Sequence, residues 1–175
     1  MRILWIEDDM VPIAKMRLDL VAAGHTVEVV RQGVASAHRK LLASFGDSTL
    51  AFDCVIIDLS LPDEKVPQTL QCWHEPLAVN GRFSMNQGQA IGQWLWESEG
   101  LRQKSGRPWH CYLTQVPDQY CNHPDAGKQE FSAADGSWIG EFLVSKWTVK
   151  NLPEVLHKLG QSWNNNFRCV SQQTL

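Results

Sequence analysis

Apolar residues gather in five short runs along the chain. The runs occupy 2–6, 25–30, 53–58, 109–114 and 141–146. The third run is apolar almost throughout, and the second alternates between apolar and polar residues. Both patterns are typical of strands, and a continuous apolar run is typical of a strand buried on both faces of a parallel sheet. We therefore expect five strands at these positions.

Four other stretches carry apolar residues at helical spacing. The first starts near Pro12, which suits an opening helical turn, and stops at Gly24. The second opens at Gly33, the third is expected over 89–100, and the last starts near Pro153. The second helix has its apolar residues on one predicted face: Val34, Ala37, Leu41, Leu42 and Phe45. This order of strands and helices predicts a doubly wound parallel sheet with right-handed crossovers.

The region between the third and fourth strands is longer than an ordinary connection. Residues 64–85 show no clear hydrophobic period and are interpreted as an insertion. Residues 117–140 are polar and rich in turn formers, so the fourth helix is expected to be reduced or irregular. We expect one domain over 1–163 and a C-terminal tail at 164–175 that is too short for an output domain.

Composition and charge exclude several classes of protein. The chain has 175 residues, 43% apolar and 20% charged, as in ordinary globular domains. A net charge of −3 gives no footprint for nucleic acid or for an anionic membrane. No apolar run approaches the roughly 18 residues of a membrane span, and the N-terminus does not resemble a signal peptide. We expect a cytoplasmic protein that binds neither nucleic acid nor membrane.

The five cysteines favour a reducing compartment over a disulfide framework, because their number is odd and their spacing irregular. Cys111, Cys121 and His123 lie near one another in the sequence. They lack the paired short spacings that zinc sites show. Cys111 also falls within a predicted strand, where a free thiol is an ordinary core residue.

Chemically active residues stand at the ends of four predicted strands. Acids follow the first and third strands, and a hydroxyl and an amine stand at the fourth and fifth: Glu7, Asp8, Asp9, Asp58, Thr114 and Lys146. The carboxyl ends of parallel strands lie on one edge of a sheet, where such folds place their chemistry. Gathered carboxylates repel one another and need a cation, and all-oxygen ligation favours Mg²⁺ or Mn²⁺. This combination predicts phosphoryl transfer to an aspartate.

These motifs resemble the receiver domain of two-component response regulators. The segment FDCVIIDLSLPD around Asp58 carries the strongest likeness, followed by the acidic triplet after ILWI. The pair LT at 113–114 and the lysine in FLVSK follow in the expected order. The likeness runs over 1–62 and about 86–160. It implies a flavodoxin-like, five-stranded parallel sheet with strand order 2-1-3-4-5, similar to that of the chemotaxis regulators.

The resemblance also implies a role for each residue at the strand ends. Asp58 would be the phosphoacceptor, Thr114 the switch hydroxyl and Lys146 the partner of the phosphoryl group. A histidine kinase or phosphotransfer protein would donate the phosphoryl group. The chain would then be a stand-alone signalling protein that contacts an unknown downstream protein, with a homodimer possible. It would not be an enzyme beyond its own phosphorylation and dephosphorylation.

The implied metal site holds Mg²⁺, with Mn²⁺ as a second choice. Asp8 and Asp58 would bind the ion directly, and Glu7 would bind it directly or through a coordinated water. The backbone carbonyl of Ser60 would be the remaining protein ligand.

Two other hypotheses stay open at the level of the sequence. Gln115, Leu143 and Trp147 replace a small residue, an aromatic residue and a proline of the family pattern. These departures motivate an atypical receiver that binds its partner without phosphorylation. A phosphatase of the haloacid-dehalogenase type would instead need an acid two residues after Asp58, and that position is Ser60.

Overall fold

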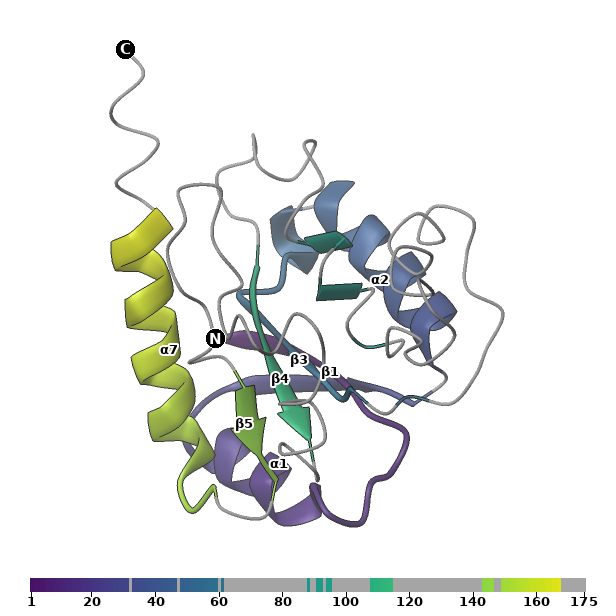
Figure 1. Cartoon of the computed structure of the whole chain (residues 1–175). Coiled ribbons are helices and arrows are strands. Elements are labelled where there is room, and N and C mark those ends of the chain that lie inside the picture. The colour runs from purple at the N-terminus through teal and green to yellow at the C-terminus, as the bar shows by residue number, and fades with distance from the viewer. Residues whose placement is uncertain are drawn as a thin grey trace, which may run out of the picture.

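A parallel sheet of five strands forms the centre of the computed structural model (Figure 1). The strands are β1 (Arg2–Ile6), β2 (Thr26–Val30), β3 (Cys54–Ile57), β4 (Trp109–Thr114) and β5 (Leu143–Ser145). Their order is β2-β1-β3-β4-β5, and every neighbouring pair is parallel. The predicted fold class and strand order are confirmed.

The structure describes 1–31, 33–46, 48–59, 61, 88, 91–92, 94–95, 108–114, 143–146 and 149–167. The predicted insertion at 64–85, and the irregular region at 117–140, lie outside these residues. Among the helices within them, none has the length and apolar composition that a membrane span requires.

Strands β1, β2 and β3 end level with one another, and β4 and β5 end two residues farther along, because Ile57 pairs with Tyr112. Ile6, the last residue of β1, pairs with Val30 of β2 and with Ile57 of β3. Thr114, the last residue of β4, pairs with Ser145 of β5. The residues that follow β1, β3 and β5 therefore emerge at the same edge of the sheet, as the sequence predicted.

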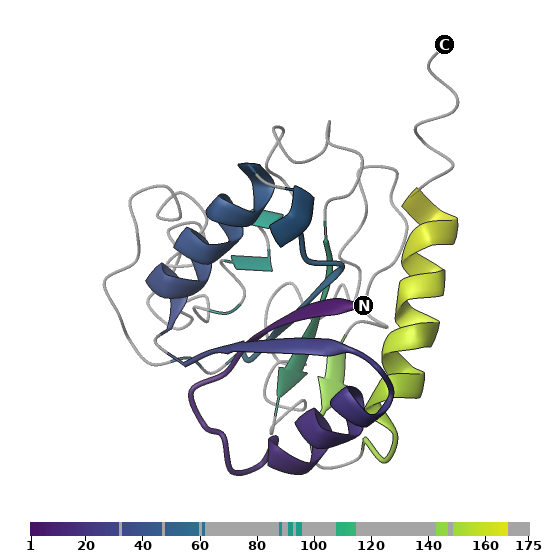
Figure 2. The ribbon, with the colours of Figure 1, turned by 180° about the vertical axis from the view of Figure 1, so that it is seen from behind.

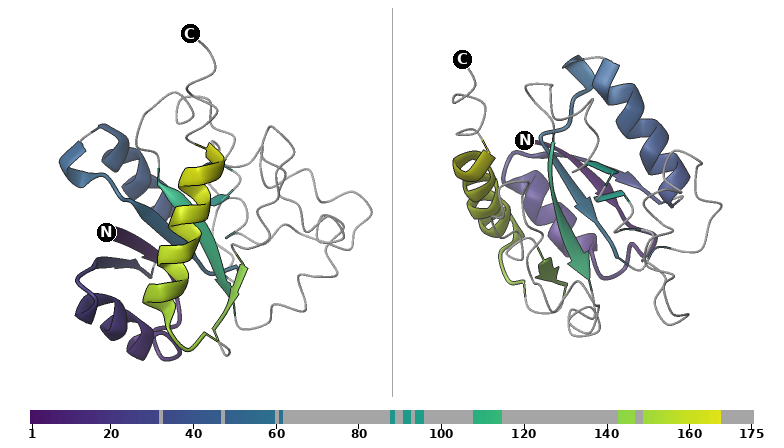
Figure 3. Two further views of the ribbon diagram at one scale, coloured as in Figure 1. Left: turned by 90° about the vertical axis from the view of Figure 1, so that its left-hand side faces the viewer. Right: turned by 45° about the horizontal axis from the view of Figure 1, so that its top comes forward.

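One face of the sheet is covered by α1 (Ala14–Ala22) and α7 (Leu152–Phe167) (Figure 3). Each helix supplies a buried apolar stripe, because residues three and four apart share one side of a helix. These residues form one core with the strands: Met16, Leu20, Leu152, Leu156 and Leu159 from the helices, and Ile3, Trp5, Cys54, Ile56, Cys111 and Leu113 from the sheet. Cys111 is a buried free thiol, as expected. Helix α7 extends four residues into the stretch predicted as a tail.

The other face is covered by α2 (Val34–Gly46), which η1 (Ser48–Leu50) follows, and by a short helical segment. We call this the Gly88 segment, and its described residues are Gly88, Ile91, Gly92, Trp94 and Leu95. Figure 2 shows α1 and α2 on opposite sides of β2. The second core contains Val34, Ala37, Leu41, Ile91, Trp94 and Leu95 from the helices, and Leu4, Ile6, Val55, Ile57 and Tyr112 from the sheet.

One residue of α2 departs from its predicted place. Leu42 is 49% exposed, whereas its neighbour Leu41 is fully buried. Positions 34, 37 and 41 repeat at helical spacing and share one stripe, and position 42 lies about a quarter-turn beyond it. His38 and Ser44 of α2 are buried as well, so the buried face of the helix is displaced from the face that its apolar residues indicate.

Candidate acidic site at the sheet edge

The backbone that carries Glu7 and Asp58 continues the hydrogen bonding of the sheet. The Asp58 amide donates to the Ile6 carbonyl at 2.9 Å, and the Glu7 amide donates to the Val30 carbonyl at 3.0 Å. These bonds fix the first residue after β3 and the first residue after β1. Both carboxylates are thereby held by the sheet and not by a loose loop.

Three carboxylates meet at this edge. Glu7, Asp8 and Asp58 each offer an oxygen, and these oxygens all lie within 4.8 Å of one another. Glu7 is 0% exposed and Asp58 is 5% exposed, while Asp8 is more exposed than either. Asp9 has a different place, because its Oδ1 accepts a hydrogen bond from the Val11 amide at 3.0 Å. Asp9 therefore shapes the loop before α1.

Lys146 brings the positive charge to the same edge. It is the first residue after β5, and its side chain is 1% exposed. Its Nζ lies 2.7 Å from Oε2 of Glu7 and 3.0 Å from Oδ2 of Asp58. One ammonium thus bridges the two buried carboxylates. The four charged residues come from three separate strand ends.

The charges of this cluster do not balance. Three carboxylates face one ammonium, and two of the carboxylates are buried. The pKa of Glu7 is raised to about 7, chiefly because the carboxyl group is buried; Lys146 opposes the shift and the charge of Asp58 adds to it. Carboxylate oxygens are the ligands that Mg²⁺ and Mn²⁺ prefer, and a divalent cation would neutralise the excess charge. The donor set therefore fits a hard divalent cation held by Glu7, Asp8 and Asp58.

The structure describes only part of the other residues that the sequence predicted for this site. Thr114 ends β4 and its backbone pairs with Ser145, next to Lys146, but its side chain lies outside the described residues. Ser60, Gln115 and Trp147 lie outside them as well.

Gly88 lies against this site, although no pattern in the sequence indicated it. A Cβ built on it would collide with the carbonyl oxygen of Asp58 and would lie 2.9 Å from the carbonyl carbon. It would also lie 3.0 Å from the Cα of Leu59. The available signal was Gly92, a glycine inside the helix expected over 89–100, which usually has a packing reason; Gly88 stands one residue before that stretch.

Comparisons with known proteins were made by sequence and by structure. No family model and no curated protein matches the chain. A fusion protein with a trimeric coiled-coil segment of yeast Spc42 matches with a TM-score of 0.55 and 16% identity. That match covers 97% of this chain and 81% of the other.

Two further solved structures are similar over nearly the whole chain. The N-terminal domain of a response regulator/sensory box/GGDEF protein from Carboxydothermus hydrogenoformans has a TM-score of 0.51 and 16% identity, covering 95% of this chain and 98% of that one. The anti-anti-sigma factor PhyR from Bartonella quintana has a TM-score of 0.52 and 13% identity. The chain spans about half of PhyR, with 99% of this chain and 51% of that one covered. Together with the strand order, these likenesses show that the protein has the fold of a response regulator receiver domain.

Proposed function

We propose that this protein accepts a phosphoryl group on Asp58 in a reaction that needs a divalent cation, and that it signals through protein contacts. The proposal rests on the acidic site formed by Glu7, Asp8, Asp58 and Lys146. A buried carboxylate lies beside a buried ammonium, with two further carboxylates within reach of a shared cation. The receiver fold supports the proposal, because receivers characteristically carry their phosphoacceptor at this edge.

The chemistry assigns a separate task to each residue. An oxygen of Asp58 forms a bond to phosphorus, and the bond between phosphorus and the donor breaks with its electron pair leaving on the donor. When bound by Glu7, Asp8 and Asp58, Mg²⁺ would supply charge neutralisation at the phosphoryl oxygens. Lys146 already lies 3.0 Å from Asp58 and is placed to pair with the same oxygens. Thr114, at the end of β4, is proposed as a hydroxyl partner, and Ser60 as a carbonyl ligand of the ion.

The partners follow from this chemistry. A phosphorylated histidine of a kinase or of a phosphotransfer protein is the proposed donor. The acquired group carries about two negative charges, which change the contacts that the surface makes with a downstream protein.

Mass spectrometry tests the proposal directly. The intact protein is incubated with acetyl phosphate and Mg²⁺, and its mass is compared with that of Asp58→Asn and of Asp19→Asn, an aspartate on α1. We expect one added phosphoryl group on the wild type and on Asp19→Asn, and none on Asp58→Asn or in the presence of EDTA. An unchanged wild-type mass, or a gain that persists in Asp58→Asn, would refute the proposal.

A further inference from the structure

The backbone of Gly88 touches the backbone of the acidic site. Gly88 has no side chain, and the space that a Cβ would need is occupied by the carbonyl group of Asp58 and by the Cα of Leu59. Both neighbours are backbone, so neither can rotate away as a side chain would. A displacement of the Asp58 backbone must therefore move the Gly88 segment with it, because packed interiors leave little free volume.

A second glycine seats the same segment on β4. A Cβ on Gly92 would collide with the hydroxyl of Tyr112 and would lie 2.6 Å from Cζ and 3.0 Å from Cε1 of its ring. Tyr112 is 3% exposed and belongs to the core beneath α2. Gly88 and Gly92 are four residues apart, and each has helical backbone. The segment thus contacts the backbone just after β3 and a side chain of β4 through two positions where a Cβ would collide.

The same segment also contacts α2 through its aromatic residue. The ring of Trp94 meets the ring of His38 edge to face, with centroids 4.5 Å apart and planes at 67°. Its centroid also lies 5.8 Å from that of Phe45. Trp94 is 7% exposed and His38 is 4% exposed. In Figure 1 the described pieces of the Gly88 segment lie beside α2. The described residues of the Gly88 segment therefore contact the Asp58 backbone at one end and α2 at the other.

We infer that the Gly88 segment transmits a change at Asp58 to α2, with Gly88 and Gly92 as positioning residues and the Trp94–His38 contact as its far end. The inference deepens the proposed function and rests on it for its trigger. Phosphorylation moves the Asp58 backbone, the segment shifts on its two glycine contacts, and the ring of Trp94 changes its place over His38. The surface of α2 then differs between the two states.

Proton NMR of the histidine rings tests this route. The chain has six histidines, so the ring signals are few, and His38→Gln identifies the signal of His38. Acetyl phosphate and Mg²⁺ are added, and Asp58 phosphorylation is followed by intact mass in the same sample. We expect the His38 signal to shift as the added mass appears, because a moved indole ring changes the local field. His157 of α7, which contacts Gln161 at 2.9 Å, is the internal control and should keep its position.

Two variants separate the route from general disturbance. Gly92→Ala places a methyl group against the ring of Tyr112 and should retain Asp58 phosphorylation while the His38 response is lost. Adding Tyr112→Leu makes room for that methyl group and should restore the response. Gly160→Ala is the matched control, since it is also a helical glycine beside an aromatic ring, but on α7, where a Cβ would lie 3.3 Å from Trp109. It should respond like the wild type.

The two measurements, added mass and the His38 signal, show whether the proposed function or the inference has failed. If the wild type gains no mass, the proposed function fails and the inference falls with it. If the mass increases and His38 keeps its signal, the proposed function stands and the inference is overturned. Should Gly92→Ala not fold, Trp94→Leu replaces it, because that change removes the ring that contacts His38. A His38 response of wild-type size in either variant would also overturn the inference.

Discussion

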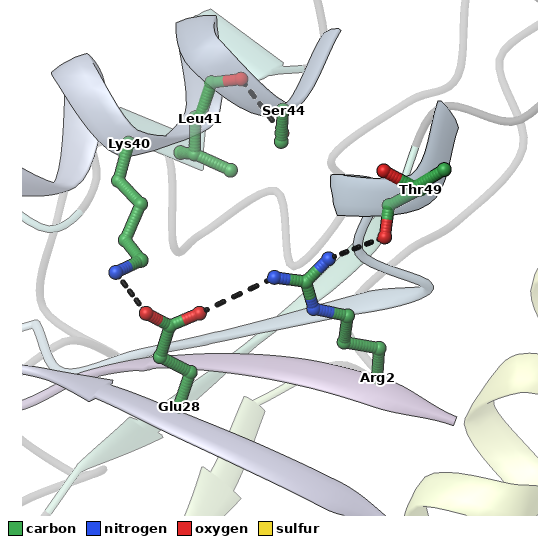
Figure 4. Close-up of polar contacts among 6 residues, drawn as sticks. All are labelled: Arg2, Glu28, Lys40, Leu41, Ser44 and Thr49. Atoms are coloured by element: carbon green, nitrogen blue, oxygen red, sulfur yellow. Dashed lines mark hydrogen bonds and ion pairs between the residues drawn. The ribbon is translucent and has the colours of Figure 1, made fainter. Parts of the chain in front are cut away.

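Two clusters of charged side chains lie against the same sheet, and they differ in burial and in the ratio of positive to negative charges. At the sheet edge, one ammonium serves two buried carboxylates, with a third carboxylate nearby. A second cluster, on the α2 side of β1 and β2, has two cationic side chains and one carboxylate (Figure 4). There the carboxylate of Glu28 pairs with Lys40 and lies 3.6 Å from Arg2. Arg2 also donates to the Thr49 carbonyl at 2.9 Å.

The comparison shows why only one of these clusters has the character of a functional site. The side chains of the Arg2–Glu28–Lys40 cluster are 28% to 37% exposed, so water and salt screen their charges. Those of Glu7 and Lys146 are 0% and 1% exposed, so their interactions are barely screened. The exposed cluster joins β1, β2, α2 and η1, and its charges need nothing further. The buried cluster keeps an excess of negative charge, which a cation or a proton must relieve.

Removing the lysine of each cluster should produce the largest difference between them, measured as a loss in the free energy of unfolding. Lys146→Met leaves Glu7 and Asp58 buried without a counter-charge and should lower the free energy of unfolding by about 3–5 kcal/mol. Lys40→Met removes an exposed partner of Glu28 and should cost at most about 1 kcal/mol. Urea unfolding in EDTA at mildly alkaline pH, where the carboxylates are ionised, measures both. Equal losses in the two variants would remove the contrast.

The pH dependence of stability should distinguish the clusters next. The pKa of Glu7 is raised from 4.5 in the unfolded chain to about 7 in the folded protein. At a pH between 4.5 and about 7, Glu7 is protonated in the folded state and ionised in the unfolded state. The folded state is therefore most stable at the lower end of this pH interval. We expect Glu7 to cost up to about 3 kcal/mol as pH rises from about 5 to about 7 without a divalent cation.

Glu7→Gln should remove this pH-dependent loss, since an amide does not titrate. The matched variant Glu28→Gln should retain it. Urea titrations in EDTA across the same pH interval make the measurement. A slope that survives in Glu7→Gln would assign it to another group.

A smaller effect is expected on cation affinity. Glu7→Gln removes one oxygen charge from the acidic site and should weaken Mg²⁺ binding about 10- to 100-fold. Glu28→Gln should leave the affinity unchanged. Trp5 lies two residues before Glu7, so a Mg²⁺ titration followed by tryptophan fluorescence reports on both variants. Comparable weakening in both would show that the titration senses overall charge and not this site.

The smallest effect concerns salt. Glu28→Gln should destabilise the protein by less than about 1 kcal/mol at low ionic strength, and the difference should shrink at about 1 M salt because exposed charges are then screened. The loss caused by Lys146→Met should persist at the same salt concentration. Urea unfolding at the two ionic strengths compares them. A salt-sensitive Lys146→Met effect would mean that water reaches the buried cluster.

Much of the fold could be predicted from the sequence because its signals are local. The strand at Arg2–Ile6 and the strand at Trp109–Thr114 begin and end where the apolar runs do. The convergence of Glu7, Asp58 and Lys146 also followed, since a parallel sheet places all of its strand ends at one edge. The role of Asp58 stays a prediction that the phosphorylation experiment tests, and the roles of Thr114 and Ser60 stay predictions as well.

Other features of the site depend on packing between distant segments. Nothing in the sequence places Gly88 against the carbonyl of Asp58, because the contact depends on how the chain returns after a long connection. The exposure of Leu42 was predicted wrongly because the buried face of α2 includes the polar residues His38 and Ser44 and is displaced from the apolar face. The contact of Trp94 with His38 likewise joins two segments that are far apart in the sequence.

By itself the sequence determined which residues form strands, the order of the sheet and the edge at which the acids gather. The strands and the shared edge follow from hydrophobic period and from the handedness of parallel crossovers. The strand order 2-1-3-4-5 was implied by the resemblance of the motifs to receiver domains. The tertiary structure alone decided how deeply Glu7 is buried, that Lys146 bridges Glu7 and Asp58, and that Gly88 lies against the Asp58 backbone. Burial and close contact are properties of three-dimensional packing, and they set the electrostatics of the site.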